Sequence, residues 1–375
     1  MVILEEPYVS KMLINYLSSS KIPVLRNQFS MQADSTEKPL NLIEEADFIS
    51  QYESHGKIYT VSEYALDWVI SKLNDAQLNR QISSVKNKNA FRKALQPLYP
   101  DFFFREIAYA DLSEFDASEM AFPVVLKPSV GFLSTGVYIL FNIEDWHKAL
   151  SEIQKNFTQL AERFPDTVVG DSTFIIESHI EGQEFAVDLY FYDKKAVIVN
   201  IFEHPFSSTK DVSDRLYVTS KEVFDKYSVR FTEYVNELNK VLKLDNMPVH
   251  IELRIDDSSI LPIEINPLRF TGMCLNEINF HITGKHPLEY YFSNTAPDYN
   301  AMWKEKEDEL FCFSIIEKPK VLSDDCHFDI DAVTKLYSDI LEVRPVGNPQ
   351  LDIQTFVFSR TKNKGDIERI LSLRI

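Results

Sequence analysis

The sequence predicts an α+β protein that begins with a small α/β unit and continues into antiparallel β-hairpins. Two observations support this class. Apolar runs alternate with a helical pattern near the start, whereas the middle and the end contain many strand-like runs separated by turns. The 375 residues fit two or three packed subdomains, and a hydrophobic content of 45% is enough for a large core.

The first 85 residues predict the α/β unit. Apolar runs at 2–4 and 22–25 flank a helical pattern at 10–19, and residues 56–60 resemble a further strand. Ser62 can cap the next helix. The buried stripe of that helix is predicted to contain Ala65, Leu66, Val69 and Leu73.

The later segments alternate between strands and a few helices. Helices are predicted at 143–164, 221–242 and 365–372 from their apolar spacing. Strands are predicted at 102–108, 123–127, 134–140, 173–177, 184–192, 196–202, 249–255, 260–266, 309–316, 340–345 and 353–359.

Composition and charge narrow the function classes. The net charge of −18 disfavours nucleic acid and anionic membranes as partners, because both repel an acidic surface. The cysteines, Cys274, Cys312 and Cys326, include no CxxC pair, so neither a zinc knuckle nor a disulfide framework is indicated. No signal peptide and no apolar stretch of about 18 residues is found. We therefore expect a cytoplasmic protein.

The segment from Val249 to Asn266 is predicted to form a β-hairpin. Apolar residues occupy its odd positions, and the sequence DDSS supplies a turn. If Glu252 pairs with Glu264, the apolar residues of both strands share one face. The opposite face then also brings His250 beside Asn266, and opposed Cβ atoms lie about 4.5–5.5 Å apart.

Two carboxylates at this distance repel each other, and a divalent cation between them would remove the repulsion. Mg²⁺ takes oxygen ligands from carboxylates, phosphates and water, and an Asn amide oxygen is another hard ligand. Glu252, Glu264 and Asn266 are therefore candidate ligands of Mg²⁺, with Mn²⁺ as an alternative. The structural alternative is a hairpin whose polar face is simply wet, with Glu252 paired to Arg254 or another neighbour.

This hairpin, with HIELR on one strand and IEINPLRFTG at the end of the other, resembles the metal-binding end of ATP-grasp enzymes. It is especially similar to L-amino-acid ligases and related carboxylate–amine ligases. Residues 86–92, 122–137 and 174–188 also resemble superfamily segments, in the same order. The resemblance implies an ATP-grasp fold with an N-terminal α/β domain at 1–85, a central lobe at 86–180, and a C-terminal lobe with an extra segment at 181–375.

The resemblance also implies which residues bind the ATP phosphates. Lys88 would contact phosphate, with Lys86 as the competing lysine. Lys127 ends an apolar strand, where a lysine is costly unless it meets an anion. Ser134 and Thr135 would donate hydrogen bonds from a loop over the phosphates. The structural alternatives are solvated helical lysines and an ordinary hairpin turn.

The segment at 174–188 would bind the nucleoside. Backbone groups near Glu177 and Ile180 would contact the adenine edge, and the Glu184 carboxylate would accept hydrogen bonds from the ribose hydroxyls. The alternative is a strand–turn–strand with exposed acids at Glu181 and Glu184.

On the substrate side, Arg269 would hold the carboxylate or its phosphorylated form through bidentate contacts. Arg254 is a second candidate for this role, and a surface salt bridge is the structural alternative. His250 would take the amine proton or contact substrate, or serve as a structural hydrogen-bonder. Lys210 and Arg215 are further candidates on a substrate-side loop.

The implied reaction is ATP- and Mg²⁺-dependent ligation of a small-molecule carboxylate to an amine, such as an amino acid or peptide, through an acyl phosphate. Alternatives on the same fold are phosphorylation of a hydroxyl, ligation to a thiol, and nucleotide binding without catalysis. We expect no nucleic acid or membrane partner, and a homodimer is the default assembly.

Overall fold

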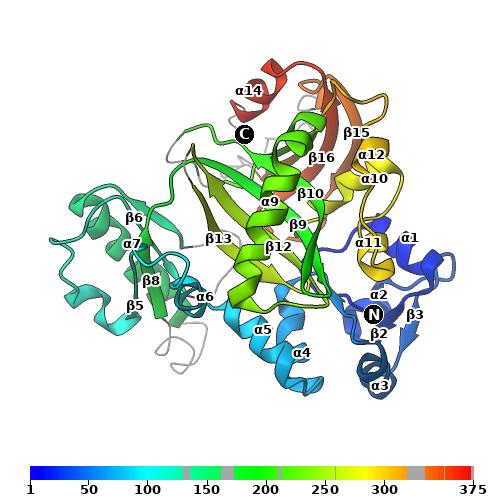
Figure 1. The fold of residues 1–375 in the computed structure, drawn as a ribbon, viewed down its shortest axis with the longest axis horizontal. Helices are drawn as coiled ribbons and strands as arrows, with labels where there is room; N and C mark the ends of the chain where they lie inside the picture. Colours follow the sequence, from blue (N-terminus) through cyan, green and yellow to red (C-terminus); the bar gives the residue numbers. More distant parts are fainter. Residues whose placement is uncertain are drawn as a thin grey trace.

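The structure is a computed structural model that describes residues 1–129, 136–161, 173–208, 211, 213–257, 259–318, 334–349 and 351–372, without the side chains of 156–161. Its strands form three sheets, with four, four and eight strands. The N-terminal sheet and the central sheet lie on different sides of the large sheet, as Figure 1 shows. The predicted α+β class is confirmed by this arrangement.

The N-terminal sheet is parallel, as expected for an α/β unit. Its strand order is β3-β2-β1-β4, and all three strand pairs run parallel. The helix α1 crosses between β1 and β2, and Ser10 begins it by accepting a hydrogen bond from the Leu13 amide at 2.9 Å. The elements are β1 (Val2–Ile3), α1 (Lys11–Ser20), β2 (Pro23–Leu25), α2 (Gln28–Ala33), β3 (Asn41–Ile43), α3 (Glu45–His55) and β4 (Tyr59–Thr60).

Helices α4 (Leu66–Lys72), α5 (Ala76–Lys86) and α6 (Lys88–Leu95) follow, and the predicted stripe of α4 is buried. A 3₁₀ turn, η1 (Glu63–Ala65), precedes α4, and the Ser62 side chain makes no cap hydrogen bond, so its predicted capping role is wrong. Asn87 ends α5 and also caps α6, because its side chain accepts a hydrogen bond from the Ala90 amide at 2.9 Å. This junction makes Lys88 the first residue of α6.

The central sheet is antiparallel, with the order β5-β8-β6-β7. The long helix α7 covers it and buries Trp146, Ala149 and Ile153. The elements are β5 (Phe104–Ala108), η2 (Tyr109–Glu114), β6 (Val124–Pro128), β7 (Tyr138–Leu140), α7 (Ile143–Ala161) and β8 (Thr173–Ser178). The strand predicted at 134–140 is thus shorter, and residues 134–135 lie outside the described residues.

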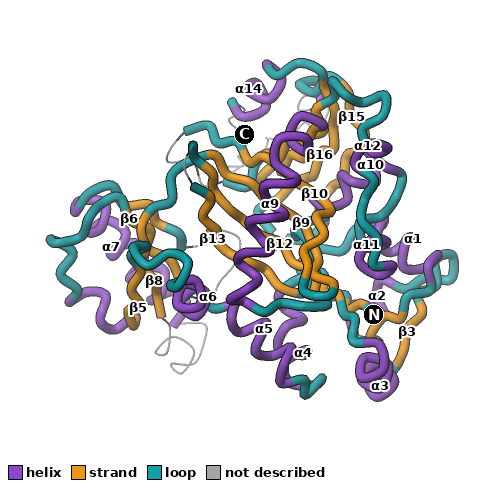
Figure 2. Tube along the Cα trace, viewed as in Figure 1, coloured by secondary structure: helices purple, strands orange, loops and turns teal. Residues whose placement is uncertain are grey.

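The large sheet is antiparallel, with the order β13-β12-β9-β10-β11-β14-β16-β15. Helix α9 (Lys221–Leu242) lies across one face and buries Phe224, Phe231 and Val235; Figures 1 and 2 show it in front of the strands. The strands are β9 (Gln183–Tyr192), β10 (Lys195–His204), β11 (Leu216–Ser220), β12 (Met247–Ile255), β13 (Ile260–Pro267), β14 (Leu310–Glu317), β15 (Asp339–Pro345) and β16 (Ile353–Thr361). The other elements are η3 (Leu275–Glu277), α10 (Ile278–Thr283), α11 (Leu288–Ser293), α12 (Tyr299–Met302) and α14 (Gly365–Leu371).

The predicted register of the β12–β13 hairpin is confirmed where it carries the acids. Glu252 pairs with Glu264, and His250 pairs with Asn266. Beyond Glu252 the register shifts by one residue, so that Leu253 pairs with Pro262. The expectation that Ile263 shares the buried face of Ile265 is therefore wrong, because a β-bulge at this point turns Ile263 to the lining of a cavity.

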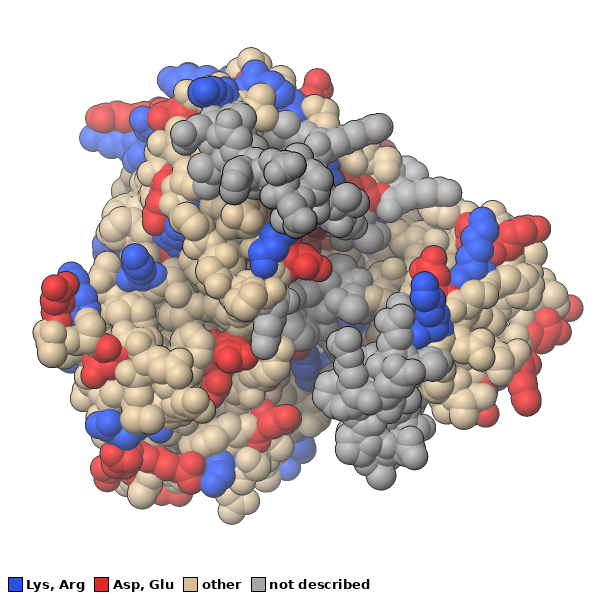
Figure 3. Space-filling model, turned by 180° about the vertical axis from the view of Figure 1, so that it is seen from behind, with Lys and Arg blue, Asp and Glu red and all other residues tan. Residues whose placement is uncertain are grey.

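The surface is mixed in charge on the face shown in Figure 3, where Lys and Arg side chains are interspersed with Asp and Glu. The large negative net charge is thus spread out rather than gathered into one patch on this face. Within the described ranges, no helix is both long enough and apolar enough to cross a membrane.

Candidate active site

A cavity of about 220 Å³ lies between the central sheet and the large sheet, and α6 and β13 contribute to its wall. Eleven of the predicted site residues that the structure describes line it. These residues are Lys88, Lys127, Glu177, Ile180, Glu184, His250, Glu252, Arg254, Glu264, Asn266 and Arg269. Ser134, Thr135 and Lys210 lie outside the described residues, and Arg215 is absent from the lining and donates to the Leu371 carbonyl instead.

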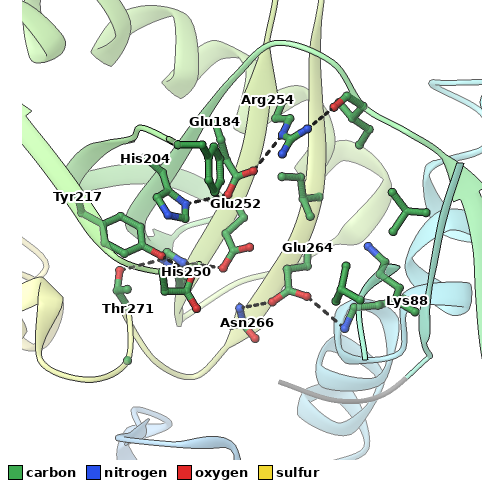
Figure 4. Close-up of a pocket in the computed structure, with 18 of the residues that line it drawn as sticks. Lys88, Glu184, His204, Tyr217, His250, Glu252, Arg254, Glu264, Asn266 and Thr271 are labelled. Atoms are coloured by element: carbon green, nitrogen blue, oxygen red, sulfur yellow. Dashed lines mark hydrogen bonds and ion pairs between the residues drawn. The ribbon is translucent and has the colours of Figure 1, made fainter. Parts of the chain in front are cut away.

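Two acids face each other at one end of the cavity. Glu252 on β12 and Glu264 on β13 point into the same space, as Figure 4 shows. The Lys88 Nζ lies 3.1 Å from Glu264 Oε2, and the Asn266 amide donates to Glu264 Oε1 at 3.0 Å. Burial and the charge of Glu264 raise the pKa of Glu252. Burial would also raise the pKa of Glu264, but Lys88 and Lys127 hold it well below its ordinary value.

This donor set fits a hard divalent cation. The pKa values of the two facing carboxyls shift in opposite directions, because only Glu264 has lysine partners. A cation between them would favour the charged form of both. In the described part of the chain, no three His, Cys, Asp or Glu side chains converge as a metal cluster. Two carboxylates and the Asn266 amide leave coordination positions for phosphate oxygens and water, which is typical of Mg²⁺ sites.

A second cluster of buried charges lies on β6, β8 and α6. Glu177 Oε1 is 2.6 Å from Lys127 Nζ, and its Oε2 accepts from Arg92 Nε at 2.6 Å. Burial opposes the ionised form of Glu177, but Arg92 and Lys127 lower its pKa to about 2. Burial lowers the pKa of Lys127, which Glu177 partly offsets. A phosphate beside Lys127 would further favour its charged form.

Lys86, the competing phosphate lysine, takes a different place. It pairs with Glu63 and does not line the cavity. Glu63 also lies 3.5 Å from the Arg269 guanidinium, whose Nη1 donates to its neighbouring carbonyl at Phe270. The geometry therefore favours Lys88 over Lys86 for a ligand in the cavity.

The predicted nucleoside contacts already have partners in this structure. Glu184 accepts hydrogen bonds from His204 Nδ1 and from Arg254 Nε, both at 2.9 Å. Arg254 Nη1 also donates to the Ile180 carbonyl at 2.6 Å. Glu184 is buried, so the alternative of an exposed acid at this position is wrong, whereas Glu181 is exposed. Arg254 lies beside the predicted nucleoside residues, and an adenine or ribose group would have to share these acceptors or displace Arg254.

His250 is held in a hydrogen-bond network on the same side of β12 as Glu252. Its Nδ1 lies 3.1 Å from Asp188 Oδ1, and its Nε2 lies 3.4 Å from Glu252 Oε1. Burial opposes the charged form, but the hydrogen bonds to Asp188 and Glu252 raise the pKa of His250 to about 9. The raised pKa favours the protonated imidazole, which donates hydrogen bonds, and the role of His250 as a base stays a prediction.

The sequence reasoning assigned no role to several residues of the site. Asp188 accepts from the Thr271 hydroxyl at 2.6 Å and from its amide at 2.7 Å. An acid within the apolar run at 185–191 was the available signal. Arg92 follows Lys88 by four residues and so lies on the same helical face. His204, Phe206 and Asp214 belong to the predicted substrate-side loop at 204–215 and also line the cavity. Another part of the wall has no motif, and it consists of Tyr217, Met273, Leu275, Phe313 and Ile315.

Residues 120–277 match the ATP-grasp domain family. No curated protein sequence matches this chain. Among solved structures, the L-amino acid ligase from Bacillus licheniformis is similar over 99% of this chain and 95% of its own, with 18% identity and a TM-score of 0.68. The N5-carboxyaminoimidazole synthase from Aspergillus clavatus, in complex with ADP and 5-aminoimidazole ribonucleotide, is similar over 99% and 96%, with 14% identity and a TM-score of 0.62.

A third similar structure is the biotin carboxylase from Campylobacter jejuni in a complex with a β,γ-ATP ligand. It covers 98% of this chain and 89% of its own, with 12% identity and a TM-score of 0.59. At such identities, the likenesses concern the fold. They extend over nearly the whole chain, including the N-terminal sheet and the tail after residue 277.

Proposed function

Because this chain contains an ATP-grasp domain and has the ATP-grasp fold, we propose that it is an ATP- and Mg²⁺-dependent ligase that joins a small-molecule carboxylate to an amine. One observation carries the proposal: Lys88 and Lys127, the facing acids, and the predicted nucleoside residues all line one cavity. The names of the similar structures support a ligase, since the L-amino acid ligase has nearly the same extent as this chain.

The phosphates of ATP would lie between Lys127 and the hairpin acids. Lys88 and Lys127 would supply fixed positive charge there, in a site where these charges are already held in place by Glu264 and Glu177. Glu252, Glu264 and Asn266 would hold Mg²⁺, with Mn²⁺ as an alternative. When bound, the cation would neutralise charge on the β- and γ-phosphates.

The carboxylate substrate would attack the γ-phosphoryl group and give an acyl phosphate and ADP, after which an amine would displace phosphate. Arg269 lines the cavity and would hold the carboxylate, since a planar guanidinium can make bidentate contacts. The adenine would lie beside Ile180, and the ribose would lie beside Glu184. Occupation of these positions would require Arg254 to share or release its contacts with both residues.

The test is a screen for release of ADP and phosphate over pairs of carboxylates and amines, amino acids first, with Mg²⁺ present. We expect ADP and phosphate in equal amounts, and only when carboxylate and amine are both supplied. Omission of either substrate, and chelation of the metal, are the controls. A phosphorylated product without free phosphate would overturn the ligase and identify a kinase. Thiol-dependent turnover would identify a carboxylate–thiol ligase, and ATP binding without turnover across the panel would identify a nucleotide-binding protein.

A further inference from the structure

We propose that Arg92 is a positioning residue that fixes the Lys127 side of the cavity in place relative to the Glu264 side. The inference rests on the proposed function, because it assigns these two sides to one bound MgATP. Arg92 lies on α6, is only 4% exposed, and does not line the cavity. It would therefore act on the ligand through its partners.

The first set of contacts joins Arg92 to the central sheet. Its Nε and Nη2 donate to the two carboxylate oxygens of Glu177, at 2.6 and 3.2 Å. This bidentate pair fixes the plane of the carboxylate. Lys127 Nζ contacts one of the same oxygens at 2.6 Å. The position of the Lys127 ammonium is thus linked through Glu177 to Arg92.

The second set of contacts joins Arg92 to β13. Its Nη1 donates to the Pro262 carbonyl at 2.7 Å, and its Nη2 donates to the Ile263 carbonyl at 3.3 Å. Carbonyls of successive residues in a regular strand point to opposite edges, so one side chain reaches both only at an irregularity. The register shift of the hairpin lies here, and Glu264 is the next residue. Arg92 therefore donates to two successive carbonyls at the bulge, and it fixes the backbone that carries Glu264.

The third link is the helix itself. Lys88 and Arg92 lie four residues apart on α6 and so share a face. Lys88 contacts the Glu264 side chain, while Arg92 contacts the backbone just before it. The Arg92 guanidinium also lies 4.6 Å from the centre of the Phe102 ring, which limits its movement. Helix α6 thus positions both Lys88, the proposed phosphate lysine, and Arg92, which contacts both sides of the cavity.

Lysine cannot replace this side chain. A guanidinium offers five donors in a planar fork, and Arg92 uses donors on all three of its nitrogens at once. A lysine would keep the charge beside Glu177 but has one nitrogen, so it would release the Pro262 and Ile263 carbonyls. The substitution R92K therefore separates the charge of Arg92 from its geometry.

The experiment measures the dissociation constant of MgATP by calorimetry, per folded molecule, for the wild type and R92K. Loss of an outer-shell support typically costs 10- to 100-fold in metal affinity or activity, so we expect MgATP binding to weaken at least about tenfold in R92K. The free Mg²⁺ concentration that gives half-maximal binding should rise in the same variant, because Glu264 is displaced.

The matched control is R344K. Arg344 is also a buried arginine, 7% exposed, with bidentate contacts to Glu342 at 2.6 and 2.8 Å and a contact to Glu277. It does not line the cavity. R344K should lower the melting temperature as R92K does, yet leave MgATP affinity within about twofold of the wild type, since no outer-shell support of the site is lost.

Equal losses of MgATP affinity in R92K and R344K would assign Arg92 a general stabilising role and overturn the inference, as would an unchanged affinity in R92K. If R92K does not fold, R92Q, which is neutral and planar, is read in the same way. Failure of both to fold would assign Arg92 to folding alone and also overturn it. A wild type that binds no MgATP would overturn the proposed function, and with it this inference; normal wild-type binding keeps the two cases apart.

Discussion

Two groups of acids in this molecule differ in how the chain neutralises them. Glu277 is 3% exposed and is contacted by Ser10 and by Arg344, while His286 Nε2 lies 3.6 Å away. Burial opposes its ionisation, but His286, Arg344 and Ser10 lower its pKa. Glu252 and Glu264, in contrast, face each other across β12 and β13, and lysine partners lower the pKa of only one of them.

The two groups also differ in what surrounds them. The Glu277 cluster joins Ser10 of the N-terminal unit to η3 and to Arg344 on β15. The positive charge of Arg344 neutralises the Glu277 carboxylate. The Glu252–Glu264 pair lines the large cavity and keeps one carboxyl with a raised pKa. Burial alone therefore does not distinguish the two groups, whereas opposite pKa shifts of two facing acids on the large cavity do.

The largest expected effect is on catalysis at the facing pair. Glu264→Ala should reduce ATP turnover by at least about a thousandfold, or about 4 kcal/mol, because it removes a proposed metal ligand and the partner of Lys88. The far-ultraviolet circular dichroism should remain that of the wild type. Turnover is measured as ADP release with Mg²⁺. Normal ADP release by the variant would show that the metal assignment is wrong.

The next effect is on stability at the other cluster. Glu277→Ala should lower the free energy of unfolding by about 3 kcal/mol, because Arg344 loses the partner of its Nη1 in a buried place. Urea unfolding measures this change, and Glu237→Ala on the exposed face of α9 is the control. The folded variant should keep its MgATP affinity. A specific loss of that affinity would erase the distinction between the two clusters.

Acid should act on the Glu277 cluster in a defined direction. A carboxyl with a lowered pKa binds protons more weakly in the folded state than in the unfolded state. Its contribution to stability is therefore complete above its ordinary pKa of 4.5 and is lost as the pH falls toward the lower folded-state value. Unfolding in urea from pH 6 to pH 3 should show a steeper loss of stability for the wild type than for Glu277→Gln. Parallel curves would contradict this assignment.

The smallest effect has the opposite sign. Glu252→Gln should raise the metal-free free energy of unfolding by up to about 1 kcal/mol, because it removes a like charge that faces Glu264. The same variant should lose the stabilisation that Mg²⁺ and ATP give to the wild type. Thermal unfolding with and without both ligands measures the two changes. A variant that is less stable without metal would show that the pair is not repulsive.

The part of the site that follows a strand period could be predicted from the sequence. Alternation fixes which residues of the hairpin share a face, and the apolar strand before Lys127 indicates its burial. The bulge at Ile263 could not be predicted, because the alternating pattern of the hairpin does not mark where one strand takes an extra residue. Ser10 and Glu277 lie 267 residues apart, and no local pattern joins them.

The strands β3 and β11 were not predicted from the sequence, and neither were the helices α3 and α5. β3 has three residues and β11 has five. β11 pairs antiparallel with β10 on one side and with β14, which is distant in the sequence, on the other. Such short segments carry too few residues for a clear period. Helix α9, with 22 residues and one apolar face, was predicted with its observed bounds. The assignment of chemical roles to the cavity residues stays a prediction, as does the division of the chain at residues 85 and 180.

The position of β13 at the edge of the eight-stranded sheet has a mechanical consequence. Among the described strands, its outer side pairs with none, and α6 reaches it through the side chains of Lys88 and Arg92. A nucleotide that wedges the two sheets apart would therefore stretch a few side-chain contacts while every rung of the ladder stays intact. The hydrogen-bonded sheet and the side-chain contacts from α6 are thus separate parts of the structure, and they meet along β13.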